Sequence, residues 1–215
     1  MITWLSPDDP IDSFPPVSTA LAEPQGLLAA GGDLRPERLL AAYRRGIFPW
    51  YSPGQPILWW SPDPREILLP AEFHCSRSLR RLRQRGLFEI RLDNDFAAVV
   101  AGCAEPRQSS PGTWITDEMQ QAYERLHRLG HAHSFEVWRA DRLVGGLYGV
   151  RLGQVFFGES MFSRESNASK LALAALVDHC LAERIGMIDC QLVSAHLRSL
   201  GSRSISRQEF LRRLE

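Results

Sequence analysis

Three strand-like segments followed directly by a long amphipathic helix constrain the fold of this chain more than any other feature. The segments are SFEVWR, RLVGGLYGV and QVFFGESMF, and the turns between them, near residues 140–141 and 152–153, suit an antiparallel meander. The helix is predicted over residues 168–184, where leucines, a valine and a cysteine recur at helical spacing. This pattern predicts an α+β domain with a largely antiparallel central sheet.

The segments on either side of the meander extend the same domain. FEIRL at 88–92 alternates as a strand does, residues 95–104 have a helical stripe, and a further helix is predicted from Thr116 to Gly130. MIDCQLV is predicted to be a short buried strand, and SISRQEFLRRL has the capping-box pattern of a final helix. From residue 88 the predicted order is therefore that of a GNAT-like acyltransferase fold, although element order alone does not establish function.

The N-terminal part differs in composition, being dense in Pro, Gly and Trp around one helix predicted from Pro36 to Gly46. We place a domain boundary near Pro64, with a small N-terminal domain over residues 1–64 and the GNAT-like catalytic domain over residues 65–215. The segment SRSLRRLRQRG, just after the boundary, predicts a basic helix that is capped by Ser76 and ended by Gly86.

Composition excludes several classes of protein. The net charge is zero, which argues against a basic coat for nucleic acid but leaves local patches possible. No apolar run approaches the roughly 18 residues that cross a bilayer, and the first residues lack the pattern of a signal peptide. The four cysteines are widely scattered and are expected to be reduced. We therefore expect a soluble, cytoplasmic protein without a membrane partner.

Several common catalytic motifs are missing from the sequence. It contains no GxxxxGK[ST] phosphate loop, no GxSxG and no zinc-finger spacing, and the histidines of HRLGHAH lack further ligands at metal-binding spacing. The segment SRESNASK, where a CoA-binding GNAT enzyme has a glycine-rich loop, contains no glycine. Its Ser166 and Asn167 can cap a helix or bind a polar substrate. We expect no metal and no cofactor.

Glu159 is the strongest candidate for a functional charge. It lies among aromatic residues and methionine in QVFFGESMF, and a carboxylate in apolar surroundings needs a partner, either an internal arginine or an incoming cation. Gly158 within this strand predicts a β-bulge, which would let Phe156 and Met161 line one pocket despite their opposite parity. Asp189 and Gln191 are two residues apart in MIDCQLV and are predicted to share a face of their strand, where they hold an amine or form a structural network.

Aromatic and basic residues give a separate indication of nucleic-acid binding. Tryptophans and tyrosines crowd the N-terminal domain, and exposed aromatic rings stack on unpaired bases, although core burial explains many of them equally well. The basic helix has five arginines within nine residues and no acid, which either hold phosphates or form a solvated face.

Long stretches of the chain together resemble the bacterial leucyl/phenylalanyl-tRNA–protein transferases. They include GLLAAGGDL, GIFPWYSP, ILWWSPDPR, GTWIT, LVGGLYGV, GESMFSR, NASK, IDCQ and HLRSLG, and they cover nearly the whole chain. The resemblance implies transfer of Leu or Phe, and in some cases Met, from aminoacyl-tRNA to proteins with N-terminal Arg or Lys. It implies that the products are degraded through the N-degron pathway, and we expect a monomer.

The resemblance also assigns roles to individual residues. It assigns contacts with the tRNA 3′-adenosine to Tyr43, Trp50, Trp114 and Tyr123. It assigns the pocket for the transferred side chain to Leu147, Phe156, Met161, Leu173, Leu176, Cys180 and Ile188. It assigns the acceptor site and the chemistry to Glu159, Asp189 and Gln191, and it assigns the tRNA acceptor stem to Arg77, Arg80, Arg81 and Arg83.

The chain departs from the family pattern at two positions. Cys180 stands where the family can have an aromatic residue, so the pocket is expected to be roomier and its preference for Leu or Phe stays open. Ser194 stands where an Asn has been proposed to assist the oxyanion, so that role does not carry over. Two other interpretations of the sequence also stay open, namely a GNAT enzyme that uses acyl-CoA and a tRNA-binding module without catalysis.

Overall fold

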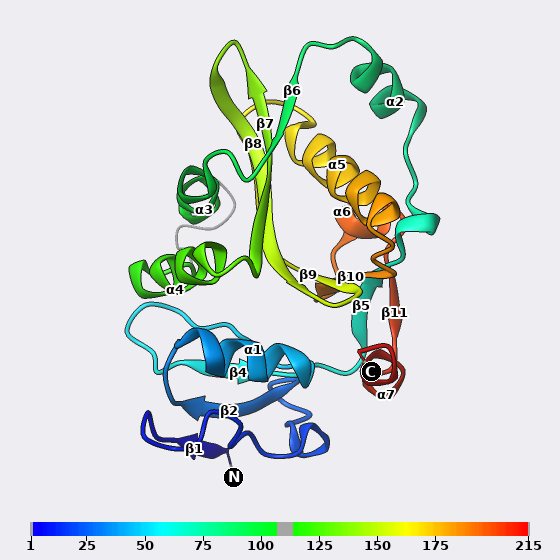
Figure 1. Ribbon diagram of the computed structural model, residues 1–215. Helices are drawn as coiled ribbons and strands as arrows, with labels where there is room; N and C mark the ends of the chain where they lie inside the picture. The colour runs from blue at the N-terminus through cyan, green and yellow to red at the C-terminus, as the bar shows by residue number, and fades with distance from the viewer. Residues whose placement is uncertain (1, 107–113, 215) are drawn as a thin grey trace. The chain divides into compact units, whose positions relative to one another are not determined.

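The computed structural model describes residues 2–106 and 114–214 (Figure 1). Its strands are β1 (Thr3–Leu5), β2 (Leu27–Gly31), β3 (Phe48–Pro49), β4 (Leu58–Trp60), β5 (Arg65–Leu68), β6 (Glu89–Leu92), β7 (Ala132–Arg139), β8 (Arg142–Leu152), β9 (Val155–Ser163), β10 (Met187–Gln191) and β11 (Arg203–Ile205). Its helices are α1 (Pro36–Arg44), α2 (Arg77–Gln84), α3 (Phe96–Ala104), α4 (Asp117–Arg128), α5 (Ala168–Ala182), α6 (Ala195–Arg198) and α7 (Arg207–Arg212), with short 3₁₀ helices η1 (Val17–Thr19) and η2 (Pro70–Glu72).

The chain forms two compact units, each built from more than one segment. The first comprises Met1–Arg65, Pro106–Ala122 and Ser204–Glu215, and the second comprises Glu66–Glu105 and Tyr123–Arg203. The division of the sequence into domains at residue 64 stays a prediction. Among the helices that the structure describes, none is long and apolar enough to cross a membrane.

The first unit contains a small sheet with the strand order β1-β2-β4-β3. Strands β1 and β2 are parallel, and β4 is antiparallel to both of its neighbours. Helix α1 begins with Pro36 in its first turn, as predicted, and lacks a side-chain cap. Trp59 of β4 is fully buried against Phe14 and donates from its indole N–H to the carbonyl of Gly31 at 2.9 Å.

The second unit is built on a larger sheet with the order β11-β5-β10-β9-β8-β7-β6. Strands β6 to β9 are antiparallel neighbours, β9 and β10 are parallel, and β10 is antiparallel to β5. Helix α5 covers one face of the meander and α3 covers the other (Figure 1). The predicted order from β6 to β10 and the largely antiparallel sheet are confirmed, and the protein has an α+β fold. Two elements that were not predicted, α6 and β11, precede the final helix α7.

Asn167 does not cap α5 through its side chain, which was one of the two roles that the sequence left open. Asn167 is at the N-cap position in the left-handed region, with φ 67°, and its side chain makes no capping bond. The hydroxyl of Ser163 instead accepts the backbone N–H of Ser169 at 3.3 Å. The end of β9 therefore supplies the polar group for the first turn of α5, which fixes the loop between the two elements.

Candidate active site

Polar side chains gather where the parallel strands β9 and β10 stop pairing. The register of this pair runs from Val155 and Met187 to Phe157 and Asp189. Glu159 and Gln191 follow these last paired residues, and the Gln191 amide Nε2 donates to Glu159 Oε1 at 2.9 Å. A side-chain bond thus joins the two strands just beyond their last paired backbone positions.

A bulge in β9 displaces Glu159 from the regular ladder. Tyr148 pairs with Ser160 and Gly149 pairs with Gly158, so Glu159 has no residue opposite it in β8. A Cβ atom on Gly149 would collide with the carbonyl of Phe157, which explains the need for glycine there. The predicted bulge is confirmed.

Glu159 is held by two donors in addition to other contacts. The Tyr123 hydroxyl donates to Glu159 Oε2 at 2.6 Å, and Gln191 holds Oε1. Glu159 is buried, with a relative solvent exposure of 8%. Burying a carboxylate costs several kcal/mol unless hydrogen bonds replace its water, and these donors supply that replacement. The group is therefore fixed in position at this end of β9.

Asp189 and Gln191 come together through an irregularity and not through regular alternation along the strand. The register with β5 shifts between these residues, and Gln191 has a left-handed backbone with φ 63°. Asp189 is fully buried, and its Oδ1 accepts the backbone N–H of Gln191 at 2.9 Å. The simple two-residue alternation predicted from sequence does not hold here, because β10 bends at Cys190 and leaves Leu192 exposed.

The structure brings all the predicted pocket residues into one hydrophobic cluster. Leu147 of β8 is opposite Met161 of β9, and α5 covers both strands. The members are Leu147, Phe156, Leu173, Leu176, Cys180 and Ile188, all buried, with Met161 partly buried against them. Burial raises the pKa of the Cys180 thiol to about 12, so this residue contributes a small neutral side chain and no thiolate.

The predicted aromatic residues differ in how much of their surface is open. Trp50 is 40% exposed, its ring lies 5.5 Å from that of Trp60, and its carbonyl accepts the Trp60 indole N–H. Trp114 is half-buried, and Gly112 and Thr113 of the GTWIT motif lie outside the described residues. Tyr43 and Tyr123 are fully buried. Trp50 is thus the ring among these four that offers the most surface to a base.

Helix α2 matches its predicted span and cap, with Ser76 Oγ accepting the Leu79 N–H at 3.2 Å. Leu79 is buried in the core cluster, with Leu82 beside it. The four predicted arginines, Arg77, Arg80, Arg81 and Arg83, are all exposed. Because the apolar side chains anchor the helix at three-residue spacing, the charges remain on its outer surface.

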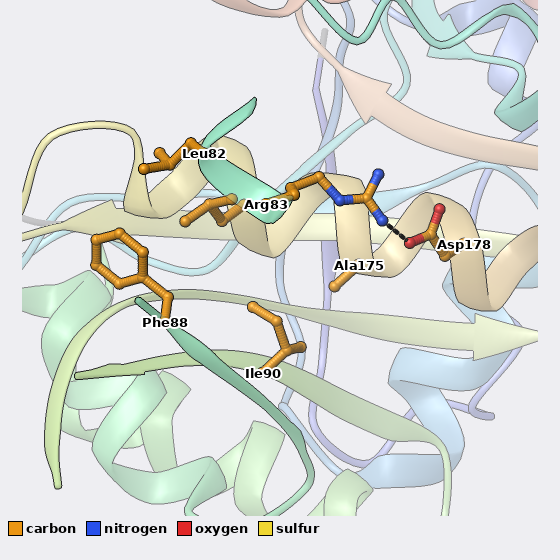
Figure 2. A pocket seen from close by; sticks show the side chains of 7 residues that line it. Leu82, Arg83, Phe88, Ile90, Ala175 and Asp178 are labelled. Atoms are coloured by element: carbon orange, nitrogen blue, oxygen red, sulfur yellow. Dashed lines mark hydrogen bonds and ion pairs between the residues drawn. The ribbon is translucent and has the colours of Figure 1, made fainter. Parts of the chain in front are cut away.

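A cleft of about 330 Å³ lies between α2, β6 and α5, and Figure 2 shows its lining. Leu82, Phe88 and Ile90 form apolar walls, and Arg83 reaches across to pair with Asp178 of α5. Arg83 is therefore partly neutralised. Arg80 and Arg81 have no ion pair with any residue in the part of the chain that the structure describes, so they are the more available for phosphates.

Sequence reasoning missed two buried polar residues beside this site. Glu66 of β5 is the register partner of Gln191, and it accepts from the Ser202 hydroxyl at 2.7 Å and from Arg198 at 3.3 Å. Tyr148 of β8 is fully buried on the side of the sheet where its ring meets Tyr123. Strand parity could have found Tyr148, since Leu147 next to it faces α5, whereas the pairing of β5 with β10 has no local sequence signal. Ser194, whose role was left open, is the half-buried N-cap residue of α6 and makes no capping bond.

Comparison with models of protein families identifies the family of this chain. The model described as leucyl/phenylalanyl-tRNA protein transferase matches residues 67–215, and the model for the N-terminal domain of the same family matches residues 32–63. The chain belongs to this family. The resemblance seen in the sequence is thereby confirmed.

Individual relatives agree with the family models over almost the full chain. A leucyl/phenylalanyl-tRNA–protein transferase from Stutzerimonas stutzeri is 59% identical over 98% of this chain and 92% of its own length. One from Pseudomonas syringae is 57% identical over 98% of this chain and 91% of its own. Among solved structures, a GCN5-related N-acetyltransferase from Kribbella flavida aligns with 11% identity over 78% of this chain and 60% of that one, at a TM-score of 0.41, a likeness too weak to bear on function.

Proposed function

We propose that this protein transfers Leu or Phe from aminoacyl-tRNA to the N-terminal Arg or Lys of acceptor proteins. The observation that carries the proposal is the Glu159–Gln191 bond, which joins two strands where they cease to pair, within a chain of this family. Met is proposed as a further transferred residue, and the modified proteins as substrates of N-degron degradation. We propose that the protein acts as a monomer in the cytoplasm.

The proposed reaction forms an amide bond and breaks the ester bond to the ribose of the tRNA. The attacking α-amine must be neutral, and its reference pKa is near 8, so a modest acceptor for its proton suffices. We assign Asp189 and Gln191 to holding this amine, with the proton passing to Asp189 or to the departing ribose oxygen. The ester is already activated, so alignment of the two reactants supplies much of the acceleration.

The apolar cluster around Met161 is assigned to the side chain that is transferred. Leu147, Phe156 and their neighbours form a buried cluster of apolar side chains, which favours Leu, Phe and Met over polar residues. Such a pocket discriminates weakly between similar apolar side chains, by roughly 10- to 200-fold per methylene. Transfer of Leu, Phe and Met by one enzyme is consistent with this weak discrimination.

Trp50 and Trp114 are assigned to the 3′-adenosine, and Arg77, Arg80, Arg81 and Arg83 to the acceptor stem. The exposed indole of Trp50 supports the first assignment, since base stacking on an aromatic ring contributes about 1–3 kcal/mol. The solvent-facing arginines of α2 support the second. Tyr43 and Tyr123 are assigned to positioning roles because their rings are buried.

One assay tests the proposal directly. Labelled Leu-tRNA or Phe-tRNA is mixed with the protein and a peptide that begins with Arg, without ATP. We expect label to appear at the peptide N-terminus. Absence of transfer, or transfer that requires an acyl-CoA, would refute the proposal.

Cys180→Phe is expected to shift the preference from Phe toward Leu. Phe is much larger than the buried thiol of Cys180, which belongs to the same cluster as Leu176 and Ile188, so it would take room from the transferred side chain. Overfilling a core costs about 1–3 kcal/mol. The ratio of kcat/KM for Phe-tRNA to that for Leu-tRNA should fall about tenfold. Cys180→Ala, which removes the thiol without filling the space, should not lower this ratio, and a higher ratio in the Phe variant would contradict the pocket assignment.

Replacing Arg80 and Arg81 together with Ala should flatten the salt dependence of tRNA binding. Each phosphate contact contributes about 0.7 to 0.9 to the slope of log K against log salt concentration, so the slope should fall by about 1 to 2. The measurement is Kd for tRNA over a range of salt concentrations. Arg142→Ala, at an exposed arginine of the β7–β8 hairpin, is the control and should leave the slope as it is. An unchanged slope in the double variant would mean that Arg80 and Arg81 face solvent and contact no phosphate of the tRNA.

A further inference from the structure

Tyr148 is a buried tyrosine whose hydroxyl has no hydrogen-bond partner among the residues that the structure describes. Buried polar groups are nearly always paired, because an unpaired one gives up its bonds to water without replacement. Phe would fill the same space without this cost. A phenol at this position therefore calls for a use that the contacts in the structure do not display.

The surroundings of Tyr148 indicate which group its hydroxyl serves. Its ring meets the ring of Tyr123 edge-to-face, with centroids 5.2 Å apart, and Tyr123 donates to Glu159. In the ladder, Tyr148 pairs with Ser160, next to the bulged Glu159. Burial, and next to it the nearby negative charge of Glu159, raise the pKa of Tyr148 well above its usual range, so the phenol stays protonated and able to donate.

Gln191 has two duties that conflict, and this conflict gives Tyr148 its role. In the structure the Gln191 Nε2 donates to Glu159, whereas the proposed function requires the carbonyl oxygen of the same planar amide to turn and accept an N–H of the acceptor amine. When the amide turns to the substrate, Glu159 loses a donor while remaining buried. We propose that Tyr148 is a positioning residue whose hydroxyl replaces Gln191 as a donor to Glu159 during the reaction, an inference that rests on the proposed function.

Thermal unfolding of four chains tests the exchange without any assay of transfer. The chains are wild type, Tyr148→Phe, Gln191→Ala and the double variant. In the wild-type background, Tyr148→Phe should leave Tm unchanged or raise it, because the hydroxyl it removes is unpaired. In the Gln191→Ala background Tyr148 should already pair with Glu159, so Tyr148→Phe should lower Tm by about 3 to 10 °C. Equal shifts in the two backgrounds would overturn the proposal.

Gln191→Met keeps the length of the side chain without its donor, and it replaces Gln191→Ala in the same cycle if the alanine chain does not fold. The prediction for this second cycle is the same, so its result still supports or overturns the proposed role of Tyr148. A double-mutant cycle isolates the coupling between two residues because the effect that each substitution has by itself is subtracted.

Steady-state kinetics separate a positioning role from a structural one, because loss of a purely structural residue would not lower kcat selectively. With Leu-tRNA and an Arg-starting peptide, Tyr148→Phe should lower kcat about tenfold or more, while KM for aminoacyl-tRNA stays the same. Tyr51→Phe, which removes a hydroxyl that makes only long bonds of 3.4 and 3.5 Å in the first unit, should leave kcat unchanged. An unchanged kcat in a wild-type enzyme that is active would overturn the role of Tyr148 alone, whereas an inactive wild type would refute the proposed function.

Discussion

Replacing Asp189 with Ala is expected to lower kcat by about 100- to 10,000-fold, the range that a positioned acid or base contributes. Two effects combine, because the carboxylate is a candidate proton acceptor and because its Oδ1 holds the backbone N–H of Gln191. Gln191 has a left-handed backbone, which is uncommon for this residue type and needs such support. The measurement is single-turnover transfer from Leu-tRNA, with tRNA affinity determined separately.

Asp189→Asn is the matched control for this prediction. The amide oxygen of Asn still accepts the Gln191 N–H, whereas the charge is lost. We expect Asn to retain more activity than Ala, because the position of Gln191 survives. Both variants should bind tRNA as tightly as wild type, and an equal loss of turnover and of tRNA affinity would make Asp189 a structural residue only.

Local patterns in the sequence were sufficient to predict the elements that surround the site. Leucines at helical spacing predicted α5, which spans Ala168–Ala182, and Gly158 predicted the bulge that displaces Glu159. Both signals are local, since periodicity and the presence of glycine depend only on neighbouring residues. The members of the hydrophobic cluster were assigned by the resemblance to the family, and the bulge accounts for Met161 and Phe156 lying on the same side.

Contacts between distant segments could not be predicted in this way. The short strands β5 and β11 have no alternation long enough to identify them, and the pairing of Glu66 with Gln191 depends on sheet order. The bend of β10 at Cys190 was also missed, because a bulge without glycine leaves no mark in the sequence. The alternation rule therefore predicted that Asp189 and Gln191 would be neighbours, but it gave a wrong geometric reason.

The partner of Glu159 illustrates the same limit. The sequence left open whether an internal arginine or an incoming cation would neutralise it. The structure shows the neutral donors Tyr123 and Gln191 on its two oxygens. Hydrogen bonds from neutral donors lower the cost of burying a carboxylate, and the proposed function assigns this carboxylate to the Arg or Lys side chain of the acceptor.

Glu159→Gln should therefore reduce transfer to peptides that begin with Arg or Lys by roughly 10- to 100-fold, which corresponds to a charged pair of about 1.5 to 3 kcal/mol. Glutamine has nearly the same shape, and its oxygen can still accept a hydrogen bond from Tyr123 or Gln191. The substitution thus removes the charge with little change of volume. The measurement is kcat/KM for Leu-tRNA with a series of peptides that differ only in their first residue.

The loss of activity with each peptide identifies the group that Glu159 neutralises. If Glu159 neutralises the acceptor side chain, the loss is confined to Arg and Lys, and a peptide with N-terminal Ala reacts with both enzymes at the same slow rate. A uniform loss across all three peptides would instead mean that the charge serves the chemistry or the fold. Thermal unfolding of the variant separates these last two cases, because a damaged fold lowers Tm whereas a lost catalytic charge does not. The selective loss is expected because Glu159, which accepts from Tyr123 and Gln191 in the structure, lies at the proposed acceptor site just beyond the last paired residues of β9 and β10.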